Sequence, residues 1–248
     1  MILSCQQSNS FSRFYNALKK YNIESINLPM IITKQVDLTD DIKNVINNIL
    51  IYDYIILTST SGVEAFNNLF NSINSNINKN KINIISVGKK TTQVIEKYGF
   101  KVKIQNPQNT AEELADYLIN QKTIFNKNVL QLKGNIASPI LKQKLGNYCN
   151  YKDVVVYNTL PNTNLNQETL HYILENKIKA ISFSSPSEIE YFLKIKEINP
   201  INKSLPIFCI GKTTAKYAQN QGFENINISS KADFETMAEL IVKTIYKN

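Results

Sequence analysis

A glycine, a lysine and two threonines follow one another at positions 211–214, directly after the apolar stretch LPIFCI. This order of residues is typical of a loop that binds a phosphate group. A phosphate loop of that type also carries a glycine five positions before its Gly-Lys-Thr. Pro206 stands there, and proline lacks an amide hydrogen and has a fixed φ angle. The sequence therefore argues against a nucleotide-binding loop.

The same stretch still predicts an anion site at the start of a helix. The first turn of a helix has unpaired backbone N–H groups and a partial positive charge, and both attract an anion. Lys212, Thr213 and Thr214 would lie in that turn. The alternative is that the threonine hydroxyls only cap the helix, and the sequence leaves both interpretations open.

Internal similarity indicates that the chain contains two copies of one unit. ISVGKKTTQVIEKYGF resembles FCIGKTTAKYAQNQGF, and Gly88 and Gly211 lie 123 positions apart in them. YIILTSTSGVEAF resembles AISFSSPSEIEYF, and Ser59 and Ser185 are separated by 126 positions. A third pair joins the stretch that begins MILSCQQ to the stretch that begins VLQLKGN, each read as strand, helix and strand.

Each copy alternates short apolar strands with helical patterns, and glycine or serine follows several strands. This alternation predicts an α/β fold with parallel strands and helices on both faces of each sheet. Five strands in each copy fit a flavodoxin-like order. Ligands of such sheets bind outside the carboxyl ends of the strands. We therefore expect two lobes whose serine, glycine and threonine turns line a cleft.

Composition narrows the kind of ligand. The chain has 248 residues, of which 43% are hydrophobic, a formal charge of +8 and a pI of about 9.2. The charge favours an acidic partner, which is a nucleic acid, an anionic membrane, or a polycarboxylate or phosphate ligand. The lysines form no block of like charge, which disfavours nucleic acid. The sequence shows no secretory signal or membrane span, so we expect a cytoplasmic protein. Nothing in it marks a long exposed apolar stripe, so we expect a monomer.

Metal and nucleophilic chemistry receive little support from the sequence. The single histidine, His171, lies on an amphipathic helical pattern without neighbouring ligands. Cys5, Cys149 and Cys209 lie in or beside apolar runs and show no CxxC spacing. These residues predict neither a zinc site nor a disulfide framework.

Taken in order, the motifs resemble the uroporphyrinogen-III synthase family. The resemblance covers nearly the whole chain and rests on ILTSTSGVEAF, SVGKKT, LKGN followed by VVVYNT, FSSPSEI and IGKTTA. Each motif is a common strand-to-helix turn, and the ordered set is the specific signal. Enzymes of this family close the linear tetrapyrrole hydroxymethylbilane into uroporphyrinogen III, with loss of water and inversion of the last ring. The resemblance implies a cyclising lyase of porphyrin and heme biosynthesis that needs no metal or organic cofactor.

The family fold implies two α/β lobes joined by a two-stranded connector. Applied to this chain, residues 1–33 and 161–248 form one discontinuous lobe, and residues 34–160 form the other. The connector strands are expected near 30–36 and 155–161. Two extended, proline-marked segments lie there, INLPMIITKQVD and VVVYNTLPNTN.

The resemblance also suggests roles for single residues. Tyr157 in VVVYNT matches the family's motif tyrosine, and we expect it to donate a hydrogen bond or a proton to the departing hydroxyl, because a phenol is protonated at neutral pH. The alternative is an aromatic side chain that only packs on a connector strand. Hydroxyl, amide and ammonium groups, and glycines that permit close approach, are expected to bind the substrate at Ser59, Gly88, Thr91, Lys133, Gly134, Asn135, Ser185, Ser187, Gly211, Lys212, Thr213 and Thr214.

The chain departs from the family pattern at several places. Family members often have proline after the glycine of the IGxTTA turn, where this chain has Lys212 and, in the first copy, Lys89. Family members often carry an arginine just after the first strand, where this chain has Cys5, Gln6 and Gln7. Lys133 stands where an arginine is common. The alternative function is a two-lobed protein that binds or senses a small anion without catalysis, because the duplicated architecture also suits closure around a ligand.

Overall fold

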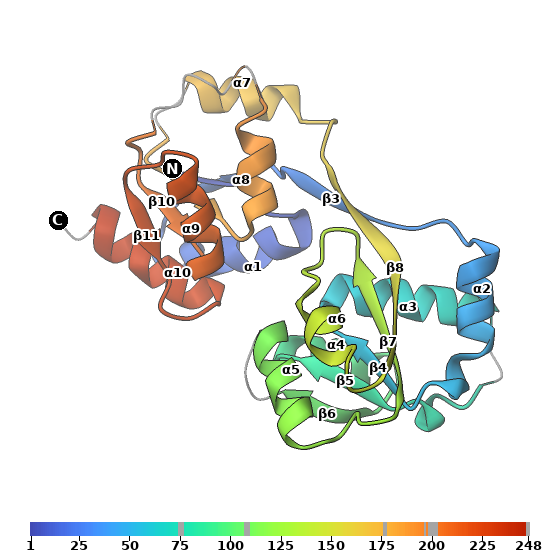
Figure 1. Cartoon of the computed structure of the whole chain (residues 1–248). Helices are drawn as coiled ribbons and strands as arrows, with labels where there is room; N and C mark the ends of the chain where they lie inside the picture. The colour runs from blue at the N-terminus through green and yellow to red at the C-terminus, as the bar shows by residue number, and fades with distance from the viewer. Residues whose placement is uncertain (74–76, 107–109, 176–177, 196, 198–202, 247–248) are drawn as a thin grey trace. The chain divides into compact units, whose positions relative to one another are not determined.

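Two β-sheets organise the chain in the computed structural model, shown in Figure 1. The structure describes residues 1–73, 77–106, 110–175, 178–195, 197 and 203–246. The chain divides into two compact units: unit 1 is Met1–Ile32 with Leu160–Asn248, and unit 2 is Thr33–Thr159.

Unit 1 contains a five-stranded sheet in the order β11-β10-β9-β1-β2, and each neighbouring pair is parallel. Numbered within the unit, the strands lie in the order 2-1-3-4-5, which is flavodoxin-like. The strands are β1 (Ile2–Ser4), β2 (Ser25–Asn27), β9 (Ala180–Phe183), β10 (Ile207–Cys209) and β11 (Ile226–Ile228).

Helices cover both faces of this sheet because successive side chains of a strand point to opposite faces. Ile2, Ala180 and Phe208 pack with α1 and α10, whereas Leu3, Ile181 and Ile207 pack with α7, α8 and α9. The helices of unit 1 are α1 (Ser8–Lys19), α7 (Gln167–Glu175), α8 (Pro186–Phe192), α9 (Lys212–Asn220) and α10 (Phe234–Ile241), which continues as a π-helical turn at Val242–Tyr246.

Unit 2 contains a six-stranded sheet in the order β3-β8-β7-β4-β5-β6. The five strands from β8 to β6 are parallel. The strands are β3 (Ile31–Gln35), β4 (Tyr54–Leu57), β5 (Ile84–Val87), β6 (Val102–Asn106), β7 (Asn128–Gly134) and β8 (Asn150–Pro161). The helices are α2 (Asp40–Asn47), α3 (Thr60–Ile73), α4 (Lys89–Lys97), α5 (Ala111–Asn120) and α6 (Ile140–Leu145), with 3₁₀ turns at Ile49–Ile51 and Lys79–Lys81.

The two units share one topology, entered by the chain at different points. When β7 is counted first, the parallel strands of unit 2 also lie in the order 2-1-3-4-5. β4, α3, β5, α4, β6 and α5 then correspond to β9, α8, β10, α9, β11 and α10, as the internal sequence similarity predicts. The predicted α/β fold of two related flavodoxin-like lobes is confirmed.

β3 and β8 form the predicted two-stranded connector. The Val36 N–H donates to the Val156 carbonyl at 3.2 Å, and the Asn162 N–H donates to the Met30 carbonyl at 2.9 Å. Met30 precedes Val36 in the chain, whereas its partner Asn162 follows Val156. β3 and β8 are therefore antiparallel. Both boundaries between the units fall inside this pair, at Ile32/Thr33 and at Thr159/Leu160.

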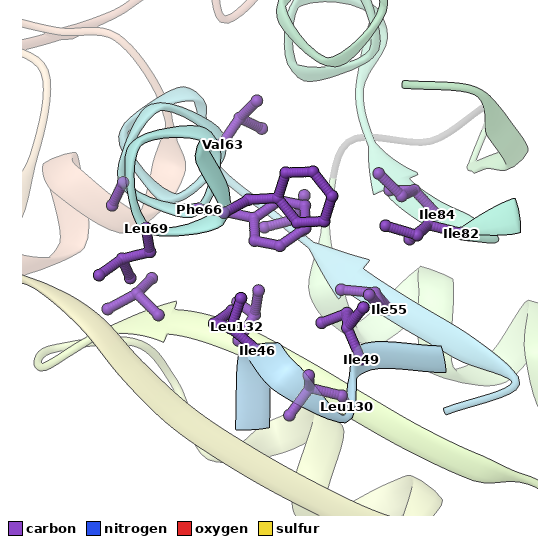
Figure 2. Packing of buried hydrophobic residues seen from close by; sticks show 14 of the residues in the cluster. Ile46, Ile49, Ile55, Val63, Phe66, Leu69, Ile82, Ile84, Leu130 and Leu132 are labelled. Atoms are coloured by element: carbon purple, nitrogen blue, oxygen red, sulfur yellow. The ribbon is translucent and has the colours of Figure 1, made fainter. Parts of the chain in front are cut away.

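Aromatic rings fill the core of unit 2 between α3 and the sheet. The Phe66 ring lies 5.1 Å from the Phe100 ring and 5.8 Å from the Phe70 ring, measured between centroids. Figure 2 shows Phe66 projecting from α3 toward Ile55 and Ile84 of the sheet. Every helix in the described part of the chain is too short or too polar to cross a membrane.

Phe66→Ala is expected to lower the free energy of unfolding by about 3–5 kcal/mol, because it removes a fully buried ring and leaves a cavity. Urea unfolding followed by circular dichroism measures the change. Ile51→Ala is the control, since the Ile51 side chain is 60% exposed and its loss should change stability by less than about 0.5 kcal/mol. Equal effects of the two substitutions would contradict the packing shown in Figure 2.

Candidate active site

The candidate residues lie where the parallel strands end. In unit 2, Ser59 follows β4 and Gly88 follows β5, while Gly134 is the last residue of β7. In unit 1, Ser185 follows β9 and Gly211 follows β10. Since the carboxyl ends of parallel strands meet at one edge of a sheet, each unit gathers its own set of turns at that edge.

Tyr157 and Ser59 are brought together in unit 2, although 98 positions separate them in the sequence. The Tyr157 phenol oxygen lies 3.0 Å from Ser59 Oγ. Ser59 Oγ also accepts a hydrogen bond from the Gly62 N–H at 3.0 Å, in the first turn of α3. The Ser59 hydroxyl therefore caps a helix and holds the phenol at the same time.

Gly134 leaves the space that the Tyr157 ring occupies. A Cβ atom at position 134 would lie 2.6 Å from the ring Cζ and 2.8 Å from the phenol oxygen of Tyr157. Any other residue would therefore displace the ring. The sequence analysis expected Gly134 to let the substrate approach the backbone closely. In the structure, the Tyr157 ring makes that close approach.

A β-bulge places Tyr157 opposite Gly134. Lys133 pairs with Val155 but Gly134 pairs with Tyr157, so Val156 is an extra residue in β8. Asn135 continues the pairing after β7: its N–H donates to the Tyr157 carbonyl at 3.1 Å. The Asn135 side chain accepts from the Thr159 N–H at 2.8 Å and donates to the Thr159 carbonyl at 3.3 Å. Asn135 thus fixes the backbone on both sides of Asn158.

Lys133 forms an ion pair within unit 2. Its ammonium lies 2.5 Å from the Asp153 carboxylate, which also binds Lys142 at 2.8 Å. Hydrogen bonds from these two lysines lower the pKa of Asp153 below its usual value. Lys212, by contrast, is exposed, and the described residues provide no carboxylate within ion-pair distance of it.

The two Gly-Lys turns differ in conformation despite their similar sequences. Gly88 has a φ angle of +76°, which strongly favours glycine, whereas Gly211 is extended at −167°. Thr91 and Thr214 are both buried, and Thr213 is exposed. Thr92, which the sequence analysis did not select, is hydrogen-bonded to Ser86 at 2.6 Å between the hydroxyl oxygens.

In unit 1 the serine turn after β9 is built around a buried carboxylate. Ser185 Oγ accepts a hydrogen bond from the Glu188 N–H at 3.4 Å and lies 3.0 Å from Ser187 Oγ. The Glu188 carboxylate accepts hydrogen bonds from the N–H and the Oγ of Ser184, each at 2.5 Å. Burial raises the pKa of Glu188 to about 7, and the hydrogen bonds from Ser184 and Ser185 oppose that shift. Sequence analysis selected neither Ser184 nor Glu188.

An open pocket of about 360 Å³ lies between the start of α8 and one face of α9. Two predicted residues, Lys212 and Thr213, contribute to it together with Lys216 and Tyr217. Lys216 follows Lys212 by one helical turn, and this spacing was the available signal in the sequence. A larger pocket of about 540 Å³, lined by Met1, Lys19, Glu24 and Ser25 among others, lies at the amino ends of β1 and β2, away from these turns.

Among the described residues, the cysteine thiols are hard to ionise and no group of side chains is arranged to bind a metal ion. Burial raises the pKa of Cys209 to about 12 and that of Cys149 to about 11, and it also raises the pKa of Cys5. No cluster of three or more His, Cys, Asp or Glu side chains suited to a metal ion occurs there. His171 is exposed on α7 and pairs with Glu175 at 3.1 Å.

Comparison with known proteins identifies the family. The family model described as uroporphyrinogen-III synthase HemD matches residues 12–239. The chain belongs to the uroporphyrinogen-III synthase family. The predicted resemblance is thus confirmed, and the alternative of a non-catalytic anion-binding protein is not favoured.

Two relatives in this family share about a quarter of their aligned residues with this chain. The porphyrin biosynthesis protein HemD of Ruminiclostridium josui is 24% identical over 249 residues, which cover 98% of this chain and 48% of that protein. The chain therefore spans about half the length of that relative. The uroporphyrinogen-III synthase of Chlorobaculum parvum is 25% identical over 173 residues, covering 68% of this chain and 69% of that protein.

Solved structures share the fold. A mutant uroporphyrinogen III synthase from Thermus thermophilus matches with a TM-score of 0.65 and 13% identity, over 100% of this chain and 99% of that one. The uroporphyrinogen-III synthetase of Helicobacter pylori matches with a TM-score of 0.62 and 20% identity, over 98% of both chains. These likenesses concern the two-lobed α/β architecture.

The buried carboxyl group makes the stability of unit 1 depend on pH. Since the pKa of Glu188 is raised from 4.5 to about 7, its stabilising contribution is complete below pH 4.5 and is lost as the pH rises to about 7. The loss amounts to about 3 kcal/mol of unfolding free energy. Glu188→Gln should lack this dependence, so it should gain stability relative to wild type as the pH rises.

Chemical denaturation at several pH values between 4.5 and 8 measures this effect. Glu190→Gln is the matched control, because the Glu190 carboxylate lies on the same helix but is partly exposed and pairs with Lys194 at 2.6 Å. Its stability should follow the wild-type pH curve. Parallel curves for wild type and Glu188→Gln would contradict the raised pKa.

Proposed function

We propose that this chain is a uroporphyrinogen-III synthase, a lyase that cyclises hydroxymethylbilane to uroporphyrinogen III with loss of water and inversion of the last ring. Family membership over residues 12–239 supports the proposal. The observation that carries the chemistry is the Tyr157 phenol, held by Ser59 against Gly134 at the family's motif tyrosine.

The hydrogen bonds of Ser59 are compatible with a phenol proton that faces the substrate. A serine hydroxyl has one donor and two acceptor sites. One acceptor site of Ser59 is occupied by the Gly62 N–H, and its hydrogen can be donated to the Tyr157 oxygen. The Tyr157 O–H is then left to donate to the substrate. Ser59 accordingly acts as a positioning residue for Tyr157.

Departure of the terminal hydroxyl is the first step of the proposed reaction. The electron-rich pyrrole supplies the electron pair that expels the hydroxyl, and the Tyr157 O–H donates to the departing oxygen, so that water leaves and an azafulvenium cation remains. The substituted carbon of the last ring then attacks the cation and forms a spiro intermediate. Fragmentation and reclosure in the inverted sense release a proton, which balances the proton taken up by the departing hydroxyl.

Orientation of the substrate is the larger part of the proposed catalysis. Without an enzyme, the unsubstituted carbon attacks the cation and the ring closes without inversion. Holding the attacking carbon near the cation contributes at most about 7–11 kcal/mol. The substrate carries carboxylate side chains, which suit the net charge of +8 and the hydroxyl turns and lysines near the strand ends. Lys212 and Lys216 are the proposed cations of unit 1.

The ring isomer of the product tests the proposed function. Incubation of hydroxymethylbilane with the purified protein, followed by chromatographic separation of the oxidised products, should yield the type III isomer. A protein that only binds anions would leave the type I isomer, which forms spontaneously. Exclusive formation of type I at high protein concentration would reject the proposed function.

Tyr157→Phe tests the role of the phenol. We expect kcat to fall by about 10²-fold, the low end of general-acid contributions, because the pyrrole already assists departure of the hydroxyl. The fold should remain, since the ring keeps its contact with Gly134. Tyr148→Phe is the control, because the Tyr148 side chain is partly exposed and stacks on Phe125. Unchanged kcat in Tyr157→Phe would remove the phenol from the mechanism.

A further inference from the structure

The serine turn of unit 1 has a carboxylate side chain where its counterpart in unit 2 has a glycine. Ser185 corresponds to Ser59, so Glu188 corresponds to Gly62. In both turns the serine Oγ accepts the N–H of the residue three positions later. Because unit 2 builds this turn with glycine, the turn itself does not require a carboxylate at the position of Glu188.

Both oxygens of the Glu188 carboxylate accept hydrogen bonds from Ser184, and the neighbouring Ser185 also stabilises the ionised form. The residue is only 2% exposed, and its two side-chain oxygens accept from the N–H and the Oγ of Ser184. Ser184 is half-buried and is the first residue after β9. The carboxylate therefore controls which way the Ser184 hydroxyl points.

Among the described residues, no cationic side chain stabilises the charge of the Glu188 carboxylate. Burial is the largest influence on its pKa. The thiols of Cys5 and Cys209 are the titratable groups that respond to its charge. The titratable side chains on α8 itself and on α9, which packs against it, are those of Glu190, Tyr191, Lys212, Lys216 and Tyr217.

Protonation of Glu188 reverses one hydrogen bond. An ionised carboxylate only accepts, so the Ser184 O–H must donate to it. A protonated carboxyl group has one O–H, which can donate to Ser184 Oγ, while its other oxygen keeps the Ser184 N–H. The hydrogen of the Ser184 hydroxyl is then free to donate elsewhere.

We propose that Glu188 is a protonation-dependent positioning residue, whose proton frees the Ser184 hydroxyl to donate a hydrogen bond to a carboxylate of the substrate. This inference rests on the proposed function for the identity of the ligand. Ser184 is thereby added to the residues that bind the polyanion, next to Ser185 and Ser187. Binding of the anion is coupled to uptake of a proton by Glu188.

The raised pKa of Glu188, about 7, places this coupling in the neutral range. At pH 6 most molecules have the hydroxyl free, and at pH 8 most do not. KM for hydroxymethylbilane should therefore rise by about tenfold from pH 6 to pH 8, following the loss of the proton.

Glu188→Gln is the decisive variant because the amide mimics the protonated carboxyl group. Its N–H₂ donates to Ser184 Oγ and its carbonyl oxygen accepts from the Ser184 N–H. KM should stay at the low value found for wild type at pH 6 and should not change up to pH 8. Glu190→Gln, on the same helix, should keep the wild-type dependence. A pH-dependent KM in Glu188→Gln would overturn the proposal.

Ser184→Ala keeps the proposal testable if Glu188→Gln does not fold. This variant lacks the hydroxyl, so KM should be high and nearly constant from pH 6 to pH 8. Retention of the wild-type pH dependence in Ser184→Ala would equally overturn the proposal.

Calorimetry separates failure of this inference from failure of the proposed function. Binding of uroporphyrin, a stable porphyrin polycarboxylate, is measured at pH 8 in two buffers of different ionisation enthalpy. Wild type should take up about one proton on binding, and Glu188→Gln should take up none. Equal uptake, or none in wild type, rejects the role of Glu188. The type III isomer assay judges the enzyme independently of this result.

Discussion

The contact between the Tyr157 ring and the backbone of Gly134 is the constraint on which the proposed chemistry depends. The ring can lie against β7 only because position 134 has no side chain. The bulge at Val156 brings the tyrosine to that place, and Asn135 holds the strand beyond it. Ser59 then reaches the phenol from the start of α3. The position of the Tyr157 phenol oxygen thus depends on the edge of the sheet, on the turns at Ser59 and Gly134, and on the bulge in β8.

Duplication supplied the architecture, and different side chains at equivalent positions supplied different chemistry. The strand registers make Lys133 equivalent to Gln6 and Asp153 equivalent to Asn27. Unit 2 therefore has an ion pair where unit 1 has two neutral amides. Gly62 and Glu188 differ in a similar way. One half fixes a phenol with neutral groups, whereas the other half buries an ionisable group beside its hydroxyls.

Sequence alone predicted the elements and their order, because alternating apolar strands and amphipathic helices allow few parallel arrangements. It also located Ser59 and Ser185, since the repeat marks both turns. It did not reveal that Ser59 binds Tyr157, because this contact depends on a bulge in β8. Nor did it reveal the partner of Lys133, since Asp153 reaches it from a neighbouring strand. The burial of Glu188 was equally hidden, because glutamate near the start of a helix is usually exposed.

The chain crosses between the units through β3 and β8, and this crossing affects the order in which the units can fold during synthesis. Unit 2 is encoded by the continuous stretch Thr33–Thr159, whereas β1 of unit 1 must wait for β9, since Ile2 pairs with Ala180. On the ribosome, unit 2 can fold while the first strands of unit 1 are still without their sheet. In each nascent chain β1 and β2 therefore lack the rest of their sheet until β9 has been translated. During that interval the apolar side chains of β1 lack the neighbours that bury them in the folded protein, which favours aggregation.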